Sequence, residues 1–467
     1  MIVVDLDGAL FCTDPTFERI AMLLRRPWLL LAALFRLPRG RAQFDAELEK
    51  HVDLEVSRLP ADMKLVGWLE TQHQLGRKLA LVSASGEAFV RQAAERFGFF
   101  DSVESVREPN GTRASCYDRL ANRYGQHFTY AGHRQSDLPL WTRCGHAVMV
   151  RCSPRLRGRL PSTVQIEREF PRVGATARTW MQALRLHQWV KNALLFVPLL
   201  LSGSLQQEAV LATFIGFVVF GLIASAAYLL NDLMDLPADR AHPVKSARPF
   251  AAGTLSIGAG LAAIPVLAAA AIALLTLLPE RFALISGAYV VLTVMYSARF
   301  KREPVLDLFV LALLYTIRII AGMVAIGAPL SPWLLAFSMF FFCSVAAIKR
   351  FAEVWLLSAE GRTHIDGRGY HAGDGTFLLA LGLASGFCSM LVFFIYLVDP
   401  NSPAHQFRRP ELMSFICVIL GYWLARAWLI ASRGMMDDDP VLFALRDRMS
   451  LALGVLLVLL VCAARWW

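Results

Sequence analysis

Long apolar runs dominate the sequence from about residue 188 onward. A helix that crosses a membrane needs about 20 mostly apolar residues, and nine runs approach that length. They lie near 188–204, 209–231, 257–278, 281–299, 305–326, 332–350, 376–398, 411–431 and 449–466. The polar residues Lys191 and Asn192 lie inside the first run, which makes it the weakest of the nine. The pattern therefore predicts an all-α polytopic membrane domain of nine transmembrane helices over 188–467.

The first 150 residues follow another pattern, in which short apolar runs alternate with charged segments. Runs at the start of the chain, at 78–85 and near 130 have the length and composition of buried strands. Residues 12–65 are mostly helical in pattern. We therefore expect a soluble α/β domain over 1–150.

A basic segment over 151–187 joins these two parts and contains Trp180. Basic residues together with a tryptophan favour a linker that ends in a helix lying on the anionic membrane surface. A linker that is simply solvated is the alternative.

Composition and charge agree with this division. Apolar residues make up 56% of the chain and charged residues 18%, against about 45–50% and 25% in soluble domains. The cations gather in the loops after the second, fourth, sixth and eighth apolar runs, and few lie in the other loops. The positive-inside rule therefore predicts that these loops and the N-terminal domain are cytoplasmic.

The densest charge lies in residues 231–249, NDLMDLPADRAHPVKSARP, between two membrane-length runs. On a helix, Asp232, Asp235 and Asp239 stand at i, i+3 and i+7 and share one face. Clustered carboxylates repel one another unless a cation lies among them, and Mg²⁺ binds a few carboxylates together with phosphate oxygens. The bases that follow suit a phosphorylated substrate, and they are Arg240, His242, Lys245 and Arg248. A solvated loop is the alternative, but it does not account for three acids in helical register.

NDLMDLPADR resembles the N-D-x-x-D-x-x-x-D signature of the UbiA-type intramembrane prenyltransferase superfamily. Further segments resemble one branch, the bacterial decaprenyl-phosphate phosphoribosyltransferases. They are QWVKN (188–192), DRAHPVKSARPFAAG (239–253), YSARFKREPVLD (296–307), YTIRIIAG (315–322), KRFAE (349–353) and LRDR (445–448). The resemblance covers about 178–467. It implies a nine-helix enzyme of the bacterial inner membrane that binds Mg²⁺ and a diphosphate at the end of its second helix.

The branch implies phosphoribosyl pyrophosphate as the donor and a polyprenyl phosphate as the acceptor, with the lipid bilayer as a further partner. A phosphate oxygen of the lipid attacks C1 of the ribose and expels pyrophosphate. The expected catalytic residues are Asp232 and Asp235, and the expected Mg²⁺ ligands are Asp232, Asp235, Asp239 and Asp307. The expected substrate-binding residues are Lys191, Asn192, Asn231, Arg240, His242, Lys245, Arg248, Tyr296, Lys301, Arg318, Lys349 and Arg350.

Two features of the membrane part qualify that resemblance. The superfamily commonly carries a second acidic signature after the fourth span, with two Asp four apart, whereas this sequence offers Asp307 alongside Glu303. The sequence therefore does not decide whether a second Mg²⁺ site exists. Arg318 lies inside the fifth run, where a charge is costly and usually functional, so we expect it to meet a phosphate or an acidic partner. A structural ion pair with an acid inside a span is the alternative.

The N-terminal domain resembles the haloacid-dehalogenase (HAD) phosphatases. MIVVDLDGAL looks like a short strand that ends in the family's first motif, with Asp5 as nucleophile and Asp7 as general acid/base. KLALVSAS at 78–85 is similar to the second motif, in which Ser83 would bind the phosphoryl group. YAGHRQSDLPLW at 130–141 is similar to the fourth, metal-binding motif. The resemblance implies a Rossmann-like sheet with its site at the carboxyl ends of the strands.

Two positions depart from the HAD pattern. The fourth motif normally reads Gly-Asp, but His133 stands in place of that Asp, and Asp137 is the only acid of the motif. The lysine of the third motif is not evident, and NGTRASCYDRL offers Arg113 instead. Because Mg²⁺ needs few protein ligands, Asp5, Asp7 and Asp137 are still expected to hold it. A retained fold without activity is the alternative.

Together these patterns predict a fusion of a HAD-type domain over 1–150, with a helical cap over about 12–65, and a transferase over 188–467. The expected function is phosphoribosyl transfer to polyprenyl phosphate, after which the N-terminal domain removes the 5-phosphate of the lipid product. The rival is a UbiA-type aromatic prenyltransferase of a quinone pathway with a degenerate HAD domain. A transporter or lipid-binding scaffold is a third class, and the acids beside HPxKxxRP argue against it. We expect no nucleic acid as a partner, and an oligomer is compatible with the sequence.

Overall fold

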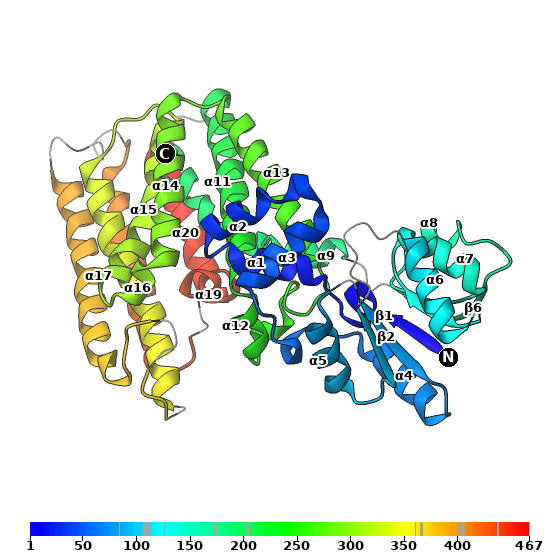
Figure 1. Ribbon diagram of the computed structural model, residues 1–467. Helices are drawn as coiled ribbons and strands as arrows, with labels where there is room; N and C mark the ends of the chain where they lie inside the picture. Colours follow the sequence, from blue (N-terminus) through cyan, green and yellow to red (C-terminus); the bar gives the residue numbers. More distant parts are fainter. Residues whose placement is uncertain are drawn as a thin grey trace. The chain divides into compact units, whose positions relative to one another are not determined.

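A computed structural model gives the fold of the chain (Figure 1). It describes residues 1–83, 85–105, 113–125, 127–171, 175–202, 206–359, 361–364, 368–399, 402, 407–436 and 439–466. Contacts divide the chain into two compact units, each made of two segments. The N-terminal unit is Met1–Arg185 with Ser225–Val266, and the bundle unit is Leu186–Ala224 with Leu267–Trp467.

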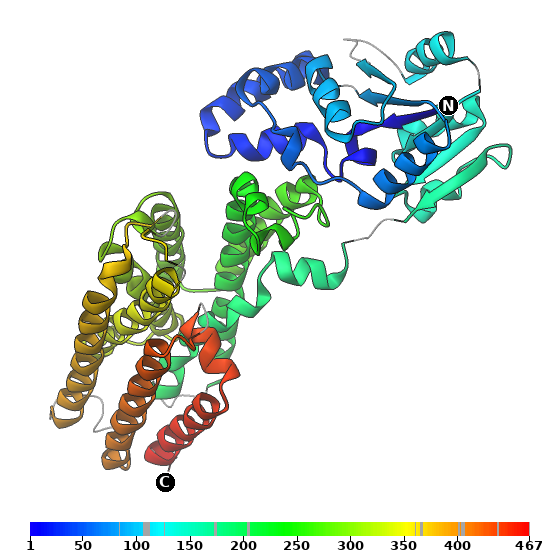
Figure 2. The same ribbon diagram turned by 90° about the horizontal axis from the view of Figure 1, so that it is seen from below.

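The N-terminal unit is built on a sheet of six parallel strands (Figures 1 and 2). The strands are β1 (Ile2–Asp5), β2 (Leu79–Ser83), β3 (Ser102–Ser105), β4 (Thr129–Gly132), β5 (His146–Val150) and β6 (Gln165–Phe170). Their order is β3-β2-β1-β4-β5-β6, which is typical of Rossmann-like folds. Strand β1 is central and fully buried, as its unbroken apolar run predicts. The parallel sheet predicted for this part of the chain is confirmed.

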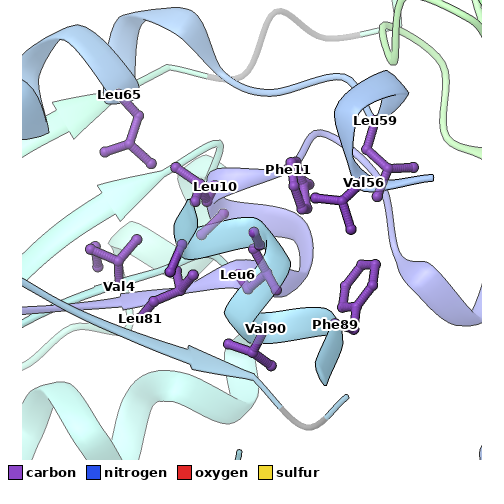
Figure 3. Close-up of a cluster of buried hydrophobic side chains, with 14 of the residues drawn as sticks. Val4, Leu6, Leu10, Phe11, Val56, Leu59, Leu65, Leu81, Phe89 and Val90 are labelled. Atoms are coloured by element: carbon purple, nitrogen blue, oxygen red, sulfur yellow. The ribbon is translucent and has the colours of Figure 1, made fainter. Parts of the chain in front are cut away.

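Helices cover both faces of this sheet. They are α4 (Met63–Gln74), α5 (Glu87–Phe97), α6 (Arg113–Tyr124) and α7 (Leu138–Cys144). Successive side chains of β1 point to opposite faces. Val4 packs in one core cluster with Val90 of α5 (Figure 3), and Val3 packs in a second cluster with Trp141 of α7. The carboxyl ends of β1, β2 and β4 therefore meet at one edge of a rigid layer.

Residues 12–65 fold into helices, as their pattern predicts. The elements are α1 (Pro15–Leu23), α2 (Pro27–Leu34), η2 (Leu37–Arg39), α3 (Arg41–His51) and η3 (Val56–Arg58), and the short π-helix η1 (Leu6–Leu10) precedes them. The carboxylate of Asp14 caps α1 by accepting from the backbone N–H of Thr16 (3.0 Å), and Pro15 suits the first helical position. Phe44 and Leu48 of α3 join the core cluster that contains β1. The role of these helices as a cap stays a prediction.

The basic segment 151–187 differs from the expected linker. It contains α8 (Pro154–Arg157), strand β6 and α9 (Ala177–Ala183). Strand β6 pairs in parallel with β5, so the sheet extends beyond the predicted boundary at residue 150. Half of its sequence QIEREF is charged, which an edge strand tolerates because most of its side chains are exposed. The helix expected around Trp180 is present as α9, and its place on a membrane surface stays a prediction.

Helices make up the bundle unit and the second segment of the N-terminal unit. The elements are η5 (Leu186–Leu195), α10 (Phe196–Ser202), α11 (Gln207–Met234), α12 (Leu236–Ala241), η6 (Lys245–Ala247), α13 (Ile257–Leu275), α14 (Glu280–Ala298), η7 (Phe300–Arg302), α15 (Leu306–Ala325), α16 (Pro332–Ala359), η8 (Ala372–Asp374), α17 (Gly375–Val398), η10 (Pro410–Leu412), α18 (Met413–Ser432), α19 (Pro440–Arg446) and α20 (Arg448–Trp466). Within the described ranges, eight of these helices are long and apolar enough to cross a membrane. The chain is therefore a multi-pass membrane protein, as predicted.

The expected first span, 188–204, is not among those eight helices, so the count of nine is not confirmed. This stretch forms η5 followed by the seven-residue helix α10. Lys191 pairs with Asp439, and Asn192 is buried against Arg318. Each of these polar side chains thus has a partner in a distant residue of the bundle unit, and residues 186–202 are divided between η5 and α10.

Candidate functional site

The acidic loop of the N-terminal unit, residues 231–249, largely keeps the helical register that its sequence predicts. Asp235 lies between α11 and α12, at the N-cap of the second helix. Its backbone N–H donates to the carbonyl of Asn231 (2.9 Å), and the N–H of Asp239 donates to the carbonyl of Asp235 (2.8 Å). These bonds carry the helical turn across the break. As a result Asp232 and Asp239 stay on the same side of the loop.

Arg248 bridges those two acids. Its Nη1 donates to Asp232 Oδ1 (3.3 Å) and to Asp239 Oδ2 (2.7 Å), and both carboxylates are buried. Asp232 Oδ1 also accepts from Nη2 of Arg185 (2.6 Å), a residue that the sequence did not single out. Two buried carboxylates this close need a positive charge between them. The guanidinium groups of Arg185 and Arg248 supply this charge here. The carboxylate oxygens of Asp232 and Asp239 also fit Mg²⁺ as ligands.

Asp235 points away from this pair. Its Oδ1 accepts from Nη2 of Arg25 (2.5 Å), the last residue but one before α2, and both side chains are exposed. The three acids predicted to act together are therefore divided, with Asp232 and Asp239 around Arg248 and Asp235 beside Arg25.

Arg240 is directed at helix α1. Its Nη1 and Nη2 donate to the two carboxylate oxygens of Glu18 (3.0 and 2.6 Å), and its Nε donates to the carbonyl of Ala251 (3.3 Å). Glu18 is buried and also accepts from the hydroxyl of Thr13 (2.6 Å). A bidentate pair of this kind fixes a guanidinium in place. Arg240 thus holds the loop against α1, and a contact with substrate phosphate would require that pair to open.

The remaining loop residues lie at the surface. The Nδ1 of His242 accepts from the backbone N–H of Val244 (3.2 Å) and of Lys245 (3.4 Å), so His242 caps the turn η6. His242 and Lys245 are exposed, and Asn231 is half-buried in the last turn of α11. Their predicted substrate contacts stay predictions.

In the bundle unit, Arg350 is the centre of a buried network. Its Nε donates to Asp307 Oδ2 (2.5 Å), and its Nη1 donates to both oxygens of Glu353 (2.8 Å each). Its Nη2 donates to the hydroxyl of Tyr296 (2.8 Å). Burial, and then the carboxylate of Asp307, raise the pKa of Tyr370, whose hydroxyl donates to Asp307 Oδ1 (2.6 Å). Asp307 therefore anchors two donors, and its role as a Mg²⁺ ligand stays a prediction.

A second cluster of the bundle unit surrounds Asp439, which the sequence analysis missed. Asp439 pairs with Lys191 and caps α19 by accepting from the N–H of Val441 (3.0 Å). Burial raises the pKa of Asp439, but Lys191 and Lys349 together lower it by more, so the net pKa lies below its usual value. Lys191, which was predicted to bind substrate, thus pairs with this carboxylate, and Lys349 interacts with it electrostatically.

Arg318 is buried in α15 and has neutral partners. Its Nε donates to Asn192 Oδ1 (2.9 Å), and its Nη2 donates to the hydroxyl of Tyr289 (2.9 Å). Among the ion pairs of the described residues none involves Arg318, so the alternative of a pair with a span acid is not seen. The structure brings together Arg318 and Asn192, which were predicted separately. Lys301 lies half-buried in η7.

The sheet edge of the N-terminal unit gathers the residues expected from the HAD resemblance. Asp5 ends β1, Ser83 ends β2, and His133 follows β4. Ligand atoms of Asp5, His133 and Asp137 all lie within 4.8 Å of one another. The side chain of Asp7 turns instead to Ser83, whose hydroxyl donates to Asp7 Oδ2 (2.7 Å). The third member of the candidate metal centre is therefore His133. The sequence had predicted Asp7 in this place. An imidazole with two carboxylates suits a transition metal better than Mg²⁺.

Backbone geometry fixes this edge. Asp137 Oδ2 accepts from the backbone N–H groups of His133 and Arg134 (2.9 Å each). Gly8 has a φ of +85°, and a Cβ there would collide with the imidazole of His133. The loop after β1 can therefore lie against His133 only because residue 8 is glycine.

Arg134 brings a positive charge into this acidic edge. Its Nε donates to Nε2 of His133 (2.8 Å), and its Nη2 donates to Asp14 Oδ2 (3.0 Å) and to the carbonyl of Asp7 (3.3 Å). Burial lowers the pKa of Arg134, but Asp14, Asp5 and the other surrounding carboxylates raise it by more, so it stays protonated. The Arg134 guanidinium thus already offsets part of the negative charge beside Asp5.

A cavity of about 880 Å³ opens beside this edge within the N-terminal unit. Its polar wall includes His133, Arg134, Arg151, Arg155 and Arg159. Its apolar wall includes Phe17, Ile20, Leu37, Phe44, Phe250 and Ile257. The combination of arginines and apolar side chains suits an anionic molecule with an apolar part.

Comparisons with known proteins identify relatives of both parts of the chain. The sequence profile of the UbiA prenyltransferase family matches residues 193–446. The uncharacterized protein y4nM of Sinorhizobium fredii is 34% identical over 461 residues, which are 98% of this chain and 89% of that protein. The decaprenyl-phosphate phosphoribosyltransferase of Mycobacterium tuberculosis is 31% identical over 289 residues, 61% of this chain and 93% of that enzyme. The solved structure of a UbiA homolog from Archaeoglobus fulgidus, bound to DMAPP and Mg²⁺, has a TM-score of 0.46 and 18% identity, and covers 61% of this chain and 98% of its own.

Proposed function

The chain belongs to the UbiA prenyltransferase family, and from this membership we propose that it transfers 5-phosphoribosyl from phosphoribosyl pyrophosphate to a polyprenyl phosphate. The relative named decaprenyl-phosphate phosphoribosyltransferase supports this pair of substrates. We place the reaction on the cytoplasmic face of a bacterial inner membrane, where the charged loops are expected.

The observation that carries the proposal is the pair of buried acids bridged by Arg248. Asp232 and Asp239, with Asp235 close in sequence, would hold Mg²⁺, which would neutralise charge on the leaving pyrophosphate. Arg185 and Arg248 would then exchange their carboxylate partners for phosphate oxygens. Phosphoribosyl pyrophosphate carries phosphate at both ends, so it needs more cations than a prenyl diphosphate does.

In the proposed step, an oxygen of the lipid phosphate attacks C1 of the ribose. The bond from C1 to the diphosphate oxygen breaks, and its electron pair leaves with pyrophosphate. The chain contributes orientation and electrostatic stabilisation, since no protein side chain becomes covalently bound. Arg318 is our candidate for binding a substrate anion in the bundle, because a buried guanidinium with neutral partners favours an anion.

We propose that the sheet edge of the N-terminal unit then removes the 5-phosphate from the lipid product. Asp5 would attack phosphorus, the bond between phosphorus and the C5 oxygen would break, and Asp7 would protonate the leaving oxygen. Water would hydrolyse the aspartyl phosphate and release inorganic phosphate. Ser83 would bind the phosphoryl group. The mixed walls of the adjacent cavity support a lipid-linked phosphate as the substrate.

The test offers purified full-length protein two substrate pairs with Mg²⁺. One is phosphoribosyl pyrophosphate with polyprenyl phosphate, and the other is a prenyl diphosphate with an aromatic acid. We expect mass spectrometry to detect a polyprenyl-phosphate ribose with the first pair and no prenylated product with the second. A product only from the second pair would replace the proposal with the aromatic prenyltransferase. No product from either pair, without release of pyrophosphate, would favour a transporter or scaffold.

A further inference from the structure

Helix α2 presents a large apolar face at the surface of the N-terminal unit. Trp28, Leu31 and Phe35 are 64%, 57% and 80% exposed, and Leu34 and Leu37 are 42% and 48% exposed. Trp28, Leu31 and Phe35 are spaced at i, i+3 and i+7, so they lie on one side of the helix. The opposite side carries Ala33, which is fully buried in the core cluster of the sheet. The helix is thus apolar on both sides, although only one side is covered.

The charges in the stretch of sequence that carries this face are all positive, and one of them, Arg25, pairs with Asp235. Between Ile20 and Phe44 the sequence contains no Asp or Glu. The basic residues of this stretch are Arg25, Arg26, Arg36, Arg39 and Arg41. Arg26 and Arg36 are exposed, one before the helix and one after it. An apolar helix face with a tryptophan and flanking arginines is typical of a helix that lies in the interface of an anionic membrane.

We propose that residues 27–37 insert into the lipid–water interface of the membrane that the chain spans. The bilayer fits this surface better than a second copy of the chain does, because two such faces would bring their arginines together. The transmembrane helices also keep the unit close to lipid at all times, so a short helix is sufficient for attachment. Contiguous exposed apolar patches on a protein surface commonly mark such interaction sites.

The inserted segment would border the cavity beside the sheet edge. Leu37 and Phe17 are both exposed and both line that cavity. A phosphate on a lipid could then enter the cavity from the headgroup layer without the lipid leaving the bilayer. This consequence rests on the proposed phosphatase activity, whereas the insertion of α2 does not.

The insertion can be tested with the full-length chain in vesicles of phosphatidylethanolamine and phosphatidylglycerol. The photoreactive residue p-benzoylphenylalanine replaces Phe35 in one protein and Leu75, which is 72% exposed at the end of α4, in a control protein. After illumination we expect phospholipid adducts on the peptide that contains position 35 and none at position 75. Equal lipid yields at the two positions, or crosslinks from position 35 to a second protein copy, would overturn the proposal.

A second variant separates insertion from catalysis. Trp28→Ser combined with Leu31→Ser should lower the adduct yield at position 35 to that of position 75, because the face loses its largest apolar side chains. Phosphate release from a lipid-linked substrate should fall in this variant, while release from a water-soluble phosphate ester stays unchanged. An unchanged adduct yield would overturn the insertion. Absence of phosphate release from either substrate in the wild type would overturn only the phosphatase proposal.

Discussion

The acidic loop and the sheet edge both hold carboxylates with arginines among them, but the two places control their charge differently. In the loop, Asp232 and Asp239 are neutralised by two partly exposed side chains, Arg185 and Arg248. Arg185 makes one contact with Asp232, and Arg248 makes one contact with each acid. At the sheet edge, Arg134 has a similar exposure but makes three contacts, with His133, Asp14 and the carbonyl of Asp7, and two backbone N–H groups hold the neighbouring carboxylate of Asp137.

This difference indicates how each place can respond to a ligand. The arginines of the loop can rotate away when Mg²⁺ and a diphosphate arrive, because Mg²⁺ would supply the positive charge that the two buried acids need and the diphosphate would offer the arginines new partners. The guanidinium at the sheet edge cannot leave without breaking its three contacts and removing a positive charge from beside the buried acids Asp5 and Asp137. The loop is therefore suited to exchange cations during each turnover, and the sheet edge is suited to keep one charge arrangement.

The largest effect is expected for a variant of Asp5, and it tests whether the sheet edge has phosphatase activity. Asp5→Asn should reduce release of inorganic phosphate by about 10³-fold or more, because it removes the nucleophile. Transfer should stay within about twofold, so the 5-phosphorylated lipid accumulates in a mass spectrum. Asp53→Asn, at an exposed carboxylate of the same unit, is the control. If wild type and Asp5→Asn yield the same phosphorylated lipid and no phosphate, the edge is a retained fold without activity.

The next effect concerns the buried pair of the loop. Asp232→Asn should reduce transfer by about 10- to 100-fold or more, because it removes a metal ligand. Asp235→Asn should cost less, because that side chain is exposed and faces Arg25. Pyrophosphate release measures both, and phosphate release from added 5-phosphorylated lipid reports that the protein is folded. Equal turnover in wild type and Asp232→Asn would refute the assignment of Asp232 as a metal ligand.

The exchange of partners by Arg248 can be examined through substrate affinity. Arg248→Ala should raise the KM for phosphoribosyl pyrophosphate by about 10- to 100-fold, since a charge-assisted phosphate contact contributes about 1.5–3 kcal/mol. The KM for the lipid should change little. Lys245→Ala should have a smaller effect in the same direction, because Lys245 lies exposed in η6. A donor KM unchanged in both variants would favour the aromatic prenyltransferase.

The smallest effect on turnover is expected from Glu18, which positions Arg240. Glu18→Gln should change transfer only a few-fold but should lower the unfolding temperature, because a broken buried ion pair costs about 3–5 kcal/mol. Intrinsic fluorescence during heating measures this change. The double variant Glu18→Gln with Arg240→Met should recover part of the lost stability, since it leaves no unpaired charge. Additive losses in the double variant would show that the two side chains do not act as a pair.

The fold was predictable where the signal is local. Eight apolar helices and the buried strands of the sheet follow from composition over short windows. The span expected over 188–204 is not confirmed, and the partners of Lys191 and Asn192 could not be foreseen because Asp439 and Arg318 lie far away in the sequence. Strand β6 was missed because an edge strand needs few apolar residues.

The site was predictable to a smaller extent. The helical spacing of the acids correctly placed Asp232 and Asp239 together, but it could not show that Asp235 faces Arg25. Glu18 carries no local signal, because its importance comes from a residue more than 200 positions later. His133 was noted as a departure from a motif, and its place beside Asp5 and Asp137 required the fold.

The division of the chain also has a consequence for its biogenesis. The N-terminal unit includes Ser225–Val266, which a ribosome makes only after α9, α10 and most of α11. At ordinary synthesis rates this segment follows Arg185 by on the order of ten seconds. During that interval the carboxylate of Glu18 lacks Arg240 and the nascent sheet domain stands incomplete. The unit can finish folding only after α11 has been made, so synthesis of the first long apolar helix must precede the last step in the maturation of the N-terminal unit.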